Sequence, residues 1–218
     1  MKVHFVVHEA FESPGAYEAW VEARGYEASY SRVYESSAFP DVDNIDLLVV
    51  LGGPQSPATT REECPHFDAA AECALIAKAV MAQKAVVGVC LGANCSVRPW
   101  APGSLTARER DRQVPISLTE AGLGNDKVAH FGDILEVGHW HNDMPGLTEN
   151  AKVLAYSEGC PRQIIEYARW CMAFNAIWSS PSMSSSGLSP RPRANSRRRP
   201  SAVSSSNRQP FVAMTMGK

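Results

Sequence analysis

Short runs of consecutive apolar residues, rich in β-branched side chains, alternate along this chain with longer segments of helical periodicity. The apolar runs predict strands and the periodic segments predict helices. The expected strands cover residues 3–7, 47–51, 85–89, 152–157 and 163–167, and the expected helices cover residues 15–24 and 67–83. Continuous apolar strands that alternate with helices are typical of a parallel sheet covered on both faces. The pattern therefore predicts an α/β fold with a mostly parallel sheet and helices on both faces.

The size and composition of the chain fit one domain with a single sizeable core. It has 218 residues, of which 44% are hydrophobic and 20% charged. No apolar run approaches the roughly 20 residues that a membrane-spanning helix needs, and a strand begins too early for a signal peptide. The six cysteines form neither a C-x-x-C pair nor a zinc-type spacing. We therefore expect a cytoplasmic protein with free thiols, no membrane partner, no metal and no cofactor.

Charge is distributed unevenly along the chain. No acidic residue follows Glu166, whereas eight basic residues do. Ser, Arg and Pro make up 23 of the 32 residues from 179 to 210. Such a segment buries too little apolar surface to offset its ordering entropy, so residues 169–218 are expected to form a disordered basic tail. A basic tail can bind nucleic acid through phosphates, but without interleaved aromatic residues we do not favour nucleic acid as a partner.

The sharpest local signal is the sequence G-V-C-L-G at residues 88–92, directly after a buried strand. Small residues two positions before and after a nucleophile let a strand turn abruptly into a helix, which exposes the central side chain. Cys90 is therefore a candidate nucleophile, with its thiol at the start of a helix. The alternative is a buried structural cysteine in a tight turn.

A second signal is the Gly52-Gly53 pair, which closes another buried strand. Backbone N–H groups exposed by such a turn could hold an oxyanion together with the amide of Leu91. A plain turn is the alternative. Both signals fall at the carboxyl ends of parallel strands, where open α/β sheets place their sites.

These stretches resemble the class I glutamine amidotransferases. Residues 87–93, V-G-V-C-L-G-A, are similar to the nucleophile motif of that family, and residues 52–56, G-G-P-Q-S, are similar to its oxyanion strand. Residues 12–15, E-S-P-G, together with Trp20, resemble the stand-alone, GMP-synthase-like branch of the family. The same is true of residues 139–143, H-W-H-N-D.

The resemblance covers residues 2–93 and 115–168, so we expect an amidotransferase-like domain over residues 1–168. It implies a flavodoxin-like fold and a hydrolase that acts on the side-chain amide of glutamine. Cys90 would form a glutamyl thioester and release ammonia to a synthase or acceptor-domain partner. The implied oxyanion donors are the amides of Gly53 and Leu91, and the implied candidate substrate-site residues are Gly52, Gln55, His139, His141 and Asp143.

The chain lacks the base that the family uses. The family supplies it from a late G-x-Q-x-H-x-E segment, in which His activates the cysteine and Glu orients the His. The last histidine of this chain is His141 and the last glutamate is Glu166. Because the His and Glu partners of Cys90 are absent, we expect little or no turnover. The alternative function is that of a non-catalytic binding or regulatory domain with the same fold.

A shift of reading frame would explain the missing motif. In the neighbouring frame, each codon consists of the last base of one original codon and the first two bases of the next. Across residues 170–179 this frame must encode Val, Gly and Gln at three positions and can encode V-Y-G-F-Q-C-H-M-E, a version of the family's segment. The same operation on residues 93–102 forces Leu and Gly and permits Q-L-L-G-E-A-L-G-A, as the helix after the elbow reads in the family. Prolines that oppose a helix stand there instead, and loss of that helix should destabilise the domain. We therefore hypothesise that residues 94–114 and 169–218 are frameshifted, which would also explain the basic tail.

His139 and His141 have two further interpretations. An H-x-H step places both rings on one face of a strand, so with Asp143 they could form a metal pair or supply a substitute base. We favour neither, because similar family members carry these residues near the site and use the later histidine for catalysis.

Overall fold

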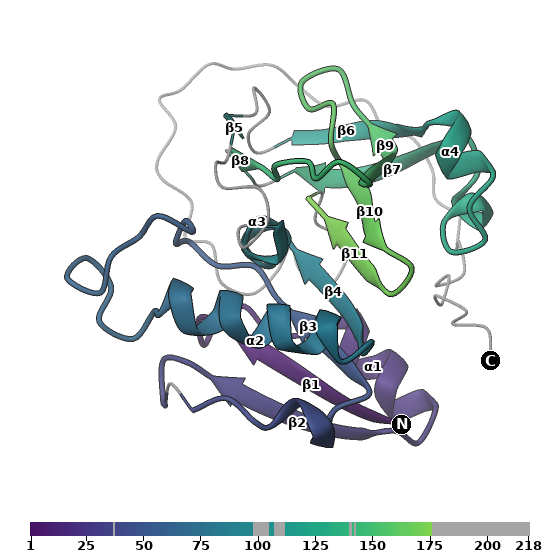
Figure 1. The fold of residues 1–218 in the computed structure, drawn as a ribbon. Helices are drawn as coiled ribbons and strands as arrows, with labels where there is room; N and C mark the ends of the chain where they lie inside the picture. The colour runs from purple at the N-terminus through teal and green to yellow at the C-terminus, as the bar shows by residue number, and fades with distance from the viewer. Residues whose placement is uncertain (37, 98–104, 107–111, 140, 142, 176–218) are drawn as a thin grey trace, which may run out of the picture.

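The computed structural model describes residues 1–36, 38–97, 105–106, 112–139, 141 and 143–175. Within these residues, one mixed sheet runs in the order β2-β1-β3-β4-β11-β10-β9-β6-β7, and a small second sheet pairs β5 with β8 (Figure 1). The strands are β1 (Lys2–Val7), β2 (Glu27–Arg32), β3 (Leu47–Val50), β4 (Ala85–Val89), β5 (Leu105–Thr106), β6 (Arg112–Leu118), β7 (Ile134–His139), β8 (Asp143–Met144), β9 (Lys152–Tyr156), β10 (Ile164–Ala168) and β11 (Cys171–Phe174).

Helices cover both faces of the parallel half of the sheet. They are α1 (Ala16–Ala23), α2 (Ala69–Met81) and α3 (Leu91–Val97), whereas α4 (Glu120–Leu123) packs against β9 and β6 of the other half. The described chain also has the 3₁₀ turns η1 (Val42–Asn44) and η2 (Ala129–Phe131). Side chains of β3 alternate between the two faces, as the pleat of a strand requires. Leu48 packs with residues of α2 such as Ile76, whereas Leu47 packs with Val21 of α1. Figure 1 shows α2 lying across one face of β3 and β1.

The α/β fold with helices on both faces is confirmed, and the sheet divides into two halves. Strands β2, β1, β3, β4 and β11 pair in parallel with one another, whereas every pairing from β11 onward through β10, β9, β6 and β7 is antiparallel. The parallel strands are those predicted from continuous apolar runs, apart from β2 and β11. Most of β2 is exposed, because it is an edge strand of the sheet.

The sheet extends beyond residue 168, where we expected the domain to end. Strand β11 lies between β4 and β10, and its Cys171, Met172 and Ala173 are buried. Those residues belong to the sheet and not to a tail, because four consecutive apolar residues fill the gap between two buried strands. The remainder of the predicted tail, residues 176–218, lies outside the described residues.

A helix does follow the elbow, contrary to our expectation that it is missing. Residues 91–97 form α3, which packs against α2. The prolines that we expected to oppose the helix come after its last residue, and residues 98–104 and 107–111 lie outside the described part. No helix in the described part has both the length and the apolar character needed to span a bilayer.

Candidate active site

Cys90 occupies a sharp turn between β4 and α3. Its φ is 50°, a left-handed value that a residue with a β-carbon rarely adopts without compensation from its surroundings. The neighbouring glycines make the turn possible by close packing. A β-carbon on Gly88 would lie 2.5 Å from the carbonyl oxygen of Gly92, and one on Gly92 would lie 2.2 Å from that of Val50. The local backbone is therefore that of a nucleophile elbow.

The Gly52-Gly53 turn lies directly beside this elbow. A β-carbon placed on Gly52 would be 3.6 Å from the β-carbon of Cys90, and one on Gly53 would be 2.9 Å from Cδ2 of Leu91. The structure thus brings together Cys90, Leu91 and both glycines, which the sequence places about 40 residues apart. This is the arrangement that an oxyanion site at a thiol requires.

The thiol of Cys90 is held in its protonated form. Burial raises the pKa of Cys90 to about 12; the carboxylates of Glu12 and Asp143 also raise it, and the N–H of Leu91 opposes the shift. A thiol attacks carbonyl groups as the thiolate, so a thiol in these surroundings needs a base to become reactive at neutral pH.

Glu12 is a site residue that the sequence reasoning noted only as part of a family motif. It follows β1, and its Oε2 would lie 3.2 Å from a β-carbon on Gly52. Burial raises the pKa of Glu12, nearby His8 lowers it and Glu9 raises it. Its carboxylate therefore lies at the mouth of the elbow on the side of the glycine turn.

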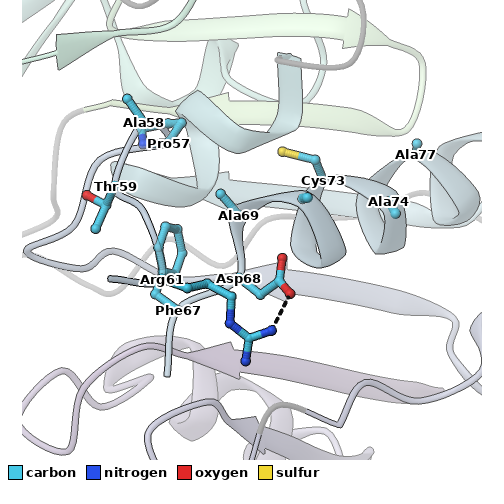
Figure 2. A pocket seen from close by; sticks show the side chains of 11 residues that line it. Pro57, Ala58, Thr59, Arg61, Phe67, Asp68, Ala69, Cys73, Ala74 and Ala77 are labelled. Carbon is cyan, nitrogen blue, oxygen red and sulfur yellow. Dashed lines mark hydrogen bonds and ion pairs between the residues drawn. The ribbon is translucent and has the colours of Figure 1, made fainter. Parts of the chain in front are cut away.

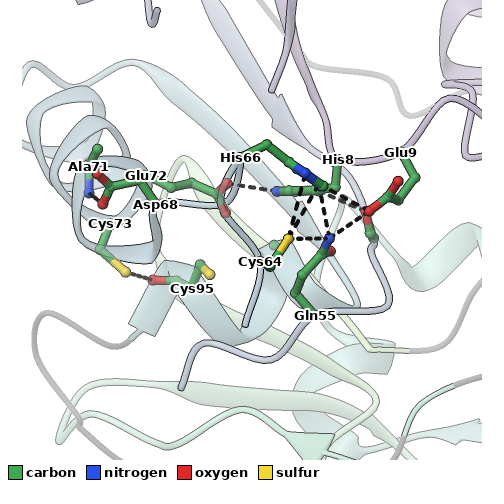
Figure 3. A network of polar contacts seen from close by, with 12 residues as sticks. His8, Glu9, Gln55, Cys64, His66, Asp68, Ala71, Glu72, Cys73 and Cys95 are labelled. Atoms are coloured by element: carbon green, nitrogen blue, oxygen red, sulfur yellow. Dashed lines mark hydrogen bonds and ion pairs between the residues drawn. The ribbon is translucent and has the colours of Figure 1, made fainter. Parts of the chain in front are cut away.

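A buried histidine–glutamate pair supports the glycine turn from below, and sequence reasoning missed both residues (Figure 3). His8 follows β1, and its Nδ1 is 2.7 Å from the carbonyl oxygen of Gly52. Its Nε2 is 2.7 Å from Oε2 of Glu72, which belongs to α2. The two side chains are 0% and 1% exposed. The only sequence signal for this pair is that His8, a polar residue, stands at the end of the apolar run of residues 3–7.

The side-chain amide of Gln55 belongs to a second polar cluster. Its Nε2 donates to Oε1 of Glu9 at 2.6 Å, and the same carboxylate oxygen is 3.2 Å from Nε2 of His66. The thiol of Cys64 lies 3.4 Å from that nitrogen (Figure 3). The structure therefore places the side chain of Gln55 beside Gly53, with its amide nitrogen in this second cluster.

The end of β11 links His141 and Asp143 to Cys90. The N–H of Cys90 donates to the carbonyl oxygen of Phe174 at 2.8 Å. The next residue, Asn175, donates from Nδ2 to Nδ1 of His141 at 3.0 Å and to the carbonyl oxygen of Asp143 at 2.9 Å. His141 is buried. His141 and Asp143 thus connect to the elbow through β11, the strand that occupies the position of the missing motif.

His139 lies deeper in the antiparallel half of the sheet. It is buried, and its Nδ1 accepts a hydrogen bond from Nε2 of Gln163 at 3.0 Å. The rings of His139 and His141 have centroids 5.6 Å apart. Within the described residues, no three His, Cys, Asp or Glu side chains are grouped so that they could hold a metal ion.

A groove along α2 is separate from the elbow (Figure 2). Small side chains of the helix contribute to its lining, as does the ion pair between Arg61 and Asp68, at 3.1 Å. The lining residues are Pro57, Ala58, Thr59, Arg61, Phe67, Asp68, Ala69, Ala70, Cys73, Ala74 and Ala77. They include neither Cys90 nor the glycine turn.

The fold and the elbow define a class of protein: an open α/β sheet that presents a cysteine at the end of a central strand, next to a glycine turn. Residues 15–169 match the family described as Glutamine amidotransferase class-I. The chain is 56% identical over 178 residues to the glutamine amidotransferase-like protein YfeJ of Salmonella typhimurium strain LT2, which covers 80% of this chain and 74% of YfeJ. The chain therefore belongs to the class I glutamine amidotransferase family.

Solved structures agree with this assignment. The crystal structure of SMU.1228c is 46% identical, with a TM-score of 0.80 over 84% of this chain and 80% of that one. A glutamine amidotransferase from Thermotoga maritima, TM1158, is 19% identical and has a TM-score of 0.71 over 81% of this chain and 75% of its own. At that identity the likeness concerns the fold alone, which is the flavodoxin-like fold expected from the sequence.

Proposed function

We propose that Cys90 is the nucleophile of a glutamine-hydrolysing site. The thiolate attacks the carbonyl carbon of the side-chain amide of glutamine, and the C–N bond then breaks as the nitrogen leaves with a proton as ammonia. Water hydrolyses the resulting glutamyl thioester to glutamate. The amides of Gly53 and Leu91 stabilise the negative oxygen. The observation that carries the proposal is the elbow at Cys90 with the Gly52-Gly53 turn beside it.

The substrate lies over the elbow in this proposal, with the turn on one side and the segment around Asp143 on the other. The candidate substrate-site residues remain Gly52, Gln55, His139, His141 and Asp143. Of these, Asp143 is near enough for its charge to raise the pKa of the Cys90 thiol. Ammonia passes to an acceptor domain or synthase partner.

The chain as written is impaired in this reaction, because its sequence lacks the late histidine that the family uses to take the proton of the nucleophilic cysteine. Its pKa of about 12 leaves almost no thiolate at neutral pH. Loss of a triad histidine commonly reduces kcat by about 10⁴- to 10⁶-fold. The sequence contains no histidine after His141.

A frameshift in the coding sequence accounts for this impairment. The match to the family ends at residue 169, where the neighbouring-frame reading of the missing motif begins. In this chain the carbonyl oxygen of Phe174 accepts a hydrogen bond from the N–H of Cys90. In the neighbouring-frame reading, histidine comes two positions after the residue that takes the place of Phe174. The base would thus follow the strand that lies beside the nucleophile. Resequencing the gene across codons 90–116 and 166–180 tests this, and an unchanged sequence would refute it.

Active-site labelling tests the role of Cys90 in the chain as it is. A chloroketone shaped like glutamine, L-2-amino-4-oxo-5-chloropentanoic acid, should alkylate Cys90 with saturation kinetics, and glutamine should protect it. Cys90→Ser should abolish the labelling, whereas Cys64→Ser, which removes a half-buried thiol of the neighbouring polar cluster, should not. Peptide mass spectrometry locates the label. Labelling elsewhere, or retention of all glutaminase activity by Cys90→Ser, would remove Cys90 from this role.

A non-catalytic binding or regulatory domain is the second candidate function, favoured by the absent base. Calorimetry with glutamine separates the two. Binding of glutamine without ammonia release, in a chain whose gene sequence is confirmed, would support the binding domain.

A further inference from the structure

The carbonyl oxygen of Gly52 and the N–H of Gly53 belong to the same peptide group. A peptide group is planar and trans, so its C=O and N–H point in opposite directions. A contact that holds the oxygen on one side therefore sets the direction of the N–H on the other. This matters at a Gly-Gly step, since glycine peptides can otherwise rotate into several backbone conformations.

His8 holds that oxygen. Its Nδ1 is 2.7 Å from the carbonyl oxygen of Gly52, and its Nε2 is 2.7 Å from the carboxylate of Glu72. A β-carbon on Gly53 would lie 3.0 Å from Cβ of His8 and 2.9 Å from Leu91, so the turn is pressed between those two residues. The peptide group thus has Glu72 and His8 on its carbonyl side and the elbow next to it.

Both partners of the His8 ring are hydrogen-bond acceptors. A carbonyl oxygen and a carboxylate can each only accept, so both ring nitrogens must carry a proton for both contacts to be hydrogen bonds. Burial alone lowers the pKa of His8, but the charge of Glu72, its hydrogen bond, the Gly52 carbonyl and the charge of Glu12 together raise it. The ring is therefore an imidazolium, and its bond to Gly52 is charge-assisted.

We propose that His8, charged through its pair with Glu72, is a positioning residue that orients and polarises the Gly52–Gly53 peptide, so that the Gly53 N–H is aimed at the oxyanion formed at Cys90. The inference rests on the proposed function of Cys90. A donated hydrogen bond at the carbonyl makes the N–H of the same peptide a stronger donor, because hydrogen bonds in chains polarise one another. Removal of a whole oxyanion donor costs about 10²- to 10³-fold in rate, so loss of its orientation should cost about 10- to 100-fold.

The test uses the full chain and two reagents for Cys90. The glutamine-shaped chloroketone places its ketone oxygen at the oxyanion position, whereas iodoacetamide needs only the thiolate. His8→Leu combined with Glu72→Leu removes the hold on Gly52 without leaving a buried charge unpaired. We expect the maximal chloroketone rate to fall about 10- to 100-fold, with its half-saturating concentration and the iodoacetamide rate changed less than about twofold. The matched control is His4→Leu, which removes another buried histidine of β1, one whose ring nitrogens contact the hydroxyls of Ser29 and Ser31, and which should change neither reagent's rate by more than about twofold.

Glu72→Gln provides a second measurement that does not depend on the double variant. Without the carboxylate, burial lowers the pKa of His8, so His8 loses its proton at a lower pH. The ratio of the chloroketone rate to the iodoacetamide rate should therefore start to fall at a lower pH than in the wild type. An unchanged ratio at every pH from 6 to 9, in both the double variant and Glu72→Gln, would show that the pair is only structural. If the wild type shows no saturable labelling at Cys90, the proposed function itself is wrong, and this inference falls with it.

Discussion

Gly92→Ala tests whether the elbow depends on close packing of its backbone. The new β-carbon would lie 2.2 Å from the carbonyl oxygen of Val50, 2.7 Å from its carbonyl carbon and 2.9 Å from its β-carbon. The first two of these atoms belong to the backbone of β3, a strand paired on both sides, so no side-chain rotation relieves the overlap. Overpacking of an interior typically costs about 1–3 kcal/mol. We expect a loss near the upper end, about 3 kcal/mol of unfolding free energy.

The measurement is urea unfolding followed by far-ultraviolet circular dichroism. A loss of about 3 kcal/mol is a large share of the 5–15 kcal/mol typical of a domain, and should lower Tm by about 6–12 °C. Gly124→Ala is the matched control: Gly124 has a φ of −87°, and its β-carbon would meet only the carbonyl oxygen of Glu120 at an ordinary 3.6 Å. If the unfolding free energies of Gly92→Ala and Gly124→Ala differ by less than about 0.5 kcal/mol, the reasoning about the elbow is refuted.

Three further changes have expected outcomes. Glu12→Gln removes a carboxylate that raises the pKa of Cys90, so the thiolate fraction and the iodoacetamide rate should rise about three- to tenfold at pH 8; a slower reaction would contradict this. Glu72→Ala removes the carboxylate that pairs with the buried His8 imidazolium and should cost about 3–5 kcal/mol by urea unfolding at pH 6. Because the folded-state pKa of His8 is raised, that contribution is complete below its unfolded pKa and is lost as pH rises through the folded one, so the cost should shrink towards high pH. Lys127→Met breaks a 2.6 Å pair with the largely buried Glu166 and should destabilise the domain, whereas Lys78→Met, on the exposed face of α2, should not.

The parallel half of the sheet was predictable because its central strands are short, continuous apolar runs. The elbow was predictable for a similar reason: its glycines are spaced by local backbone geometry, which sequence records directly. Strand β2 was not predictable, since an edge strand needs no apolar face and most of its residues are exposed.

The support for the site could not be read from sequence. His8 and Glu72 are 64 positions apart, and neither follows a periodic pattern. Their pairing depends on how α2 packs on the sheet, which is a tertiary property. Strand β11 was not predicted, because burial between β4 and β10 decides the structure of its four apolar residues, and that burial is a tertiary property.

The central place of β11 has a consequence for how this protein is made. It is the last strand of the described chain, yet it lies between β4 and β10. Until it leaves the ribosome, the edges of both neighbours present unpaired N–H and C=O groups to other chains, which is the exposure that promotes aggregation. Pairing Val86 with Cys171 also closes a long loop, a slow step in folding. The nascent chain therefore depends on β11 for solubility as well as for the completion of the described sheet.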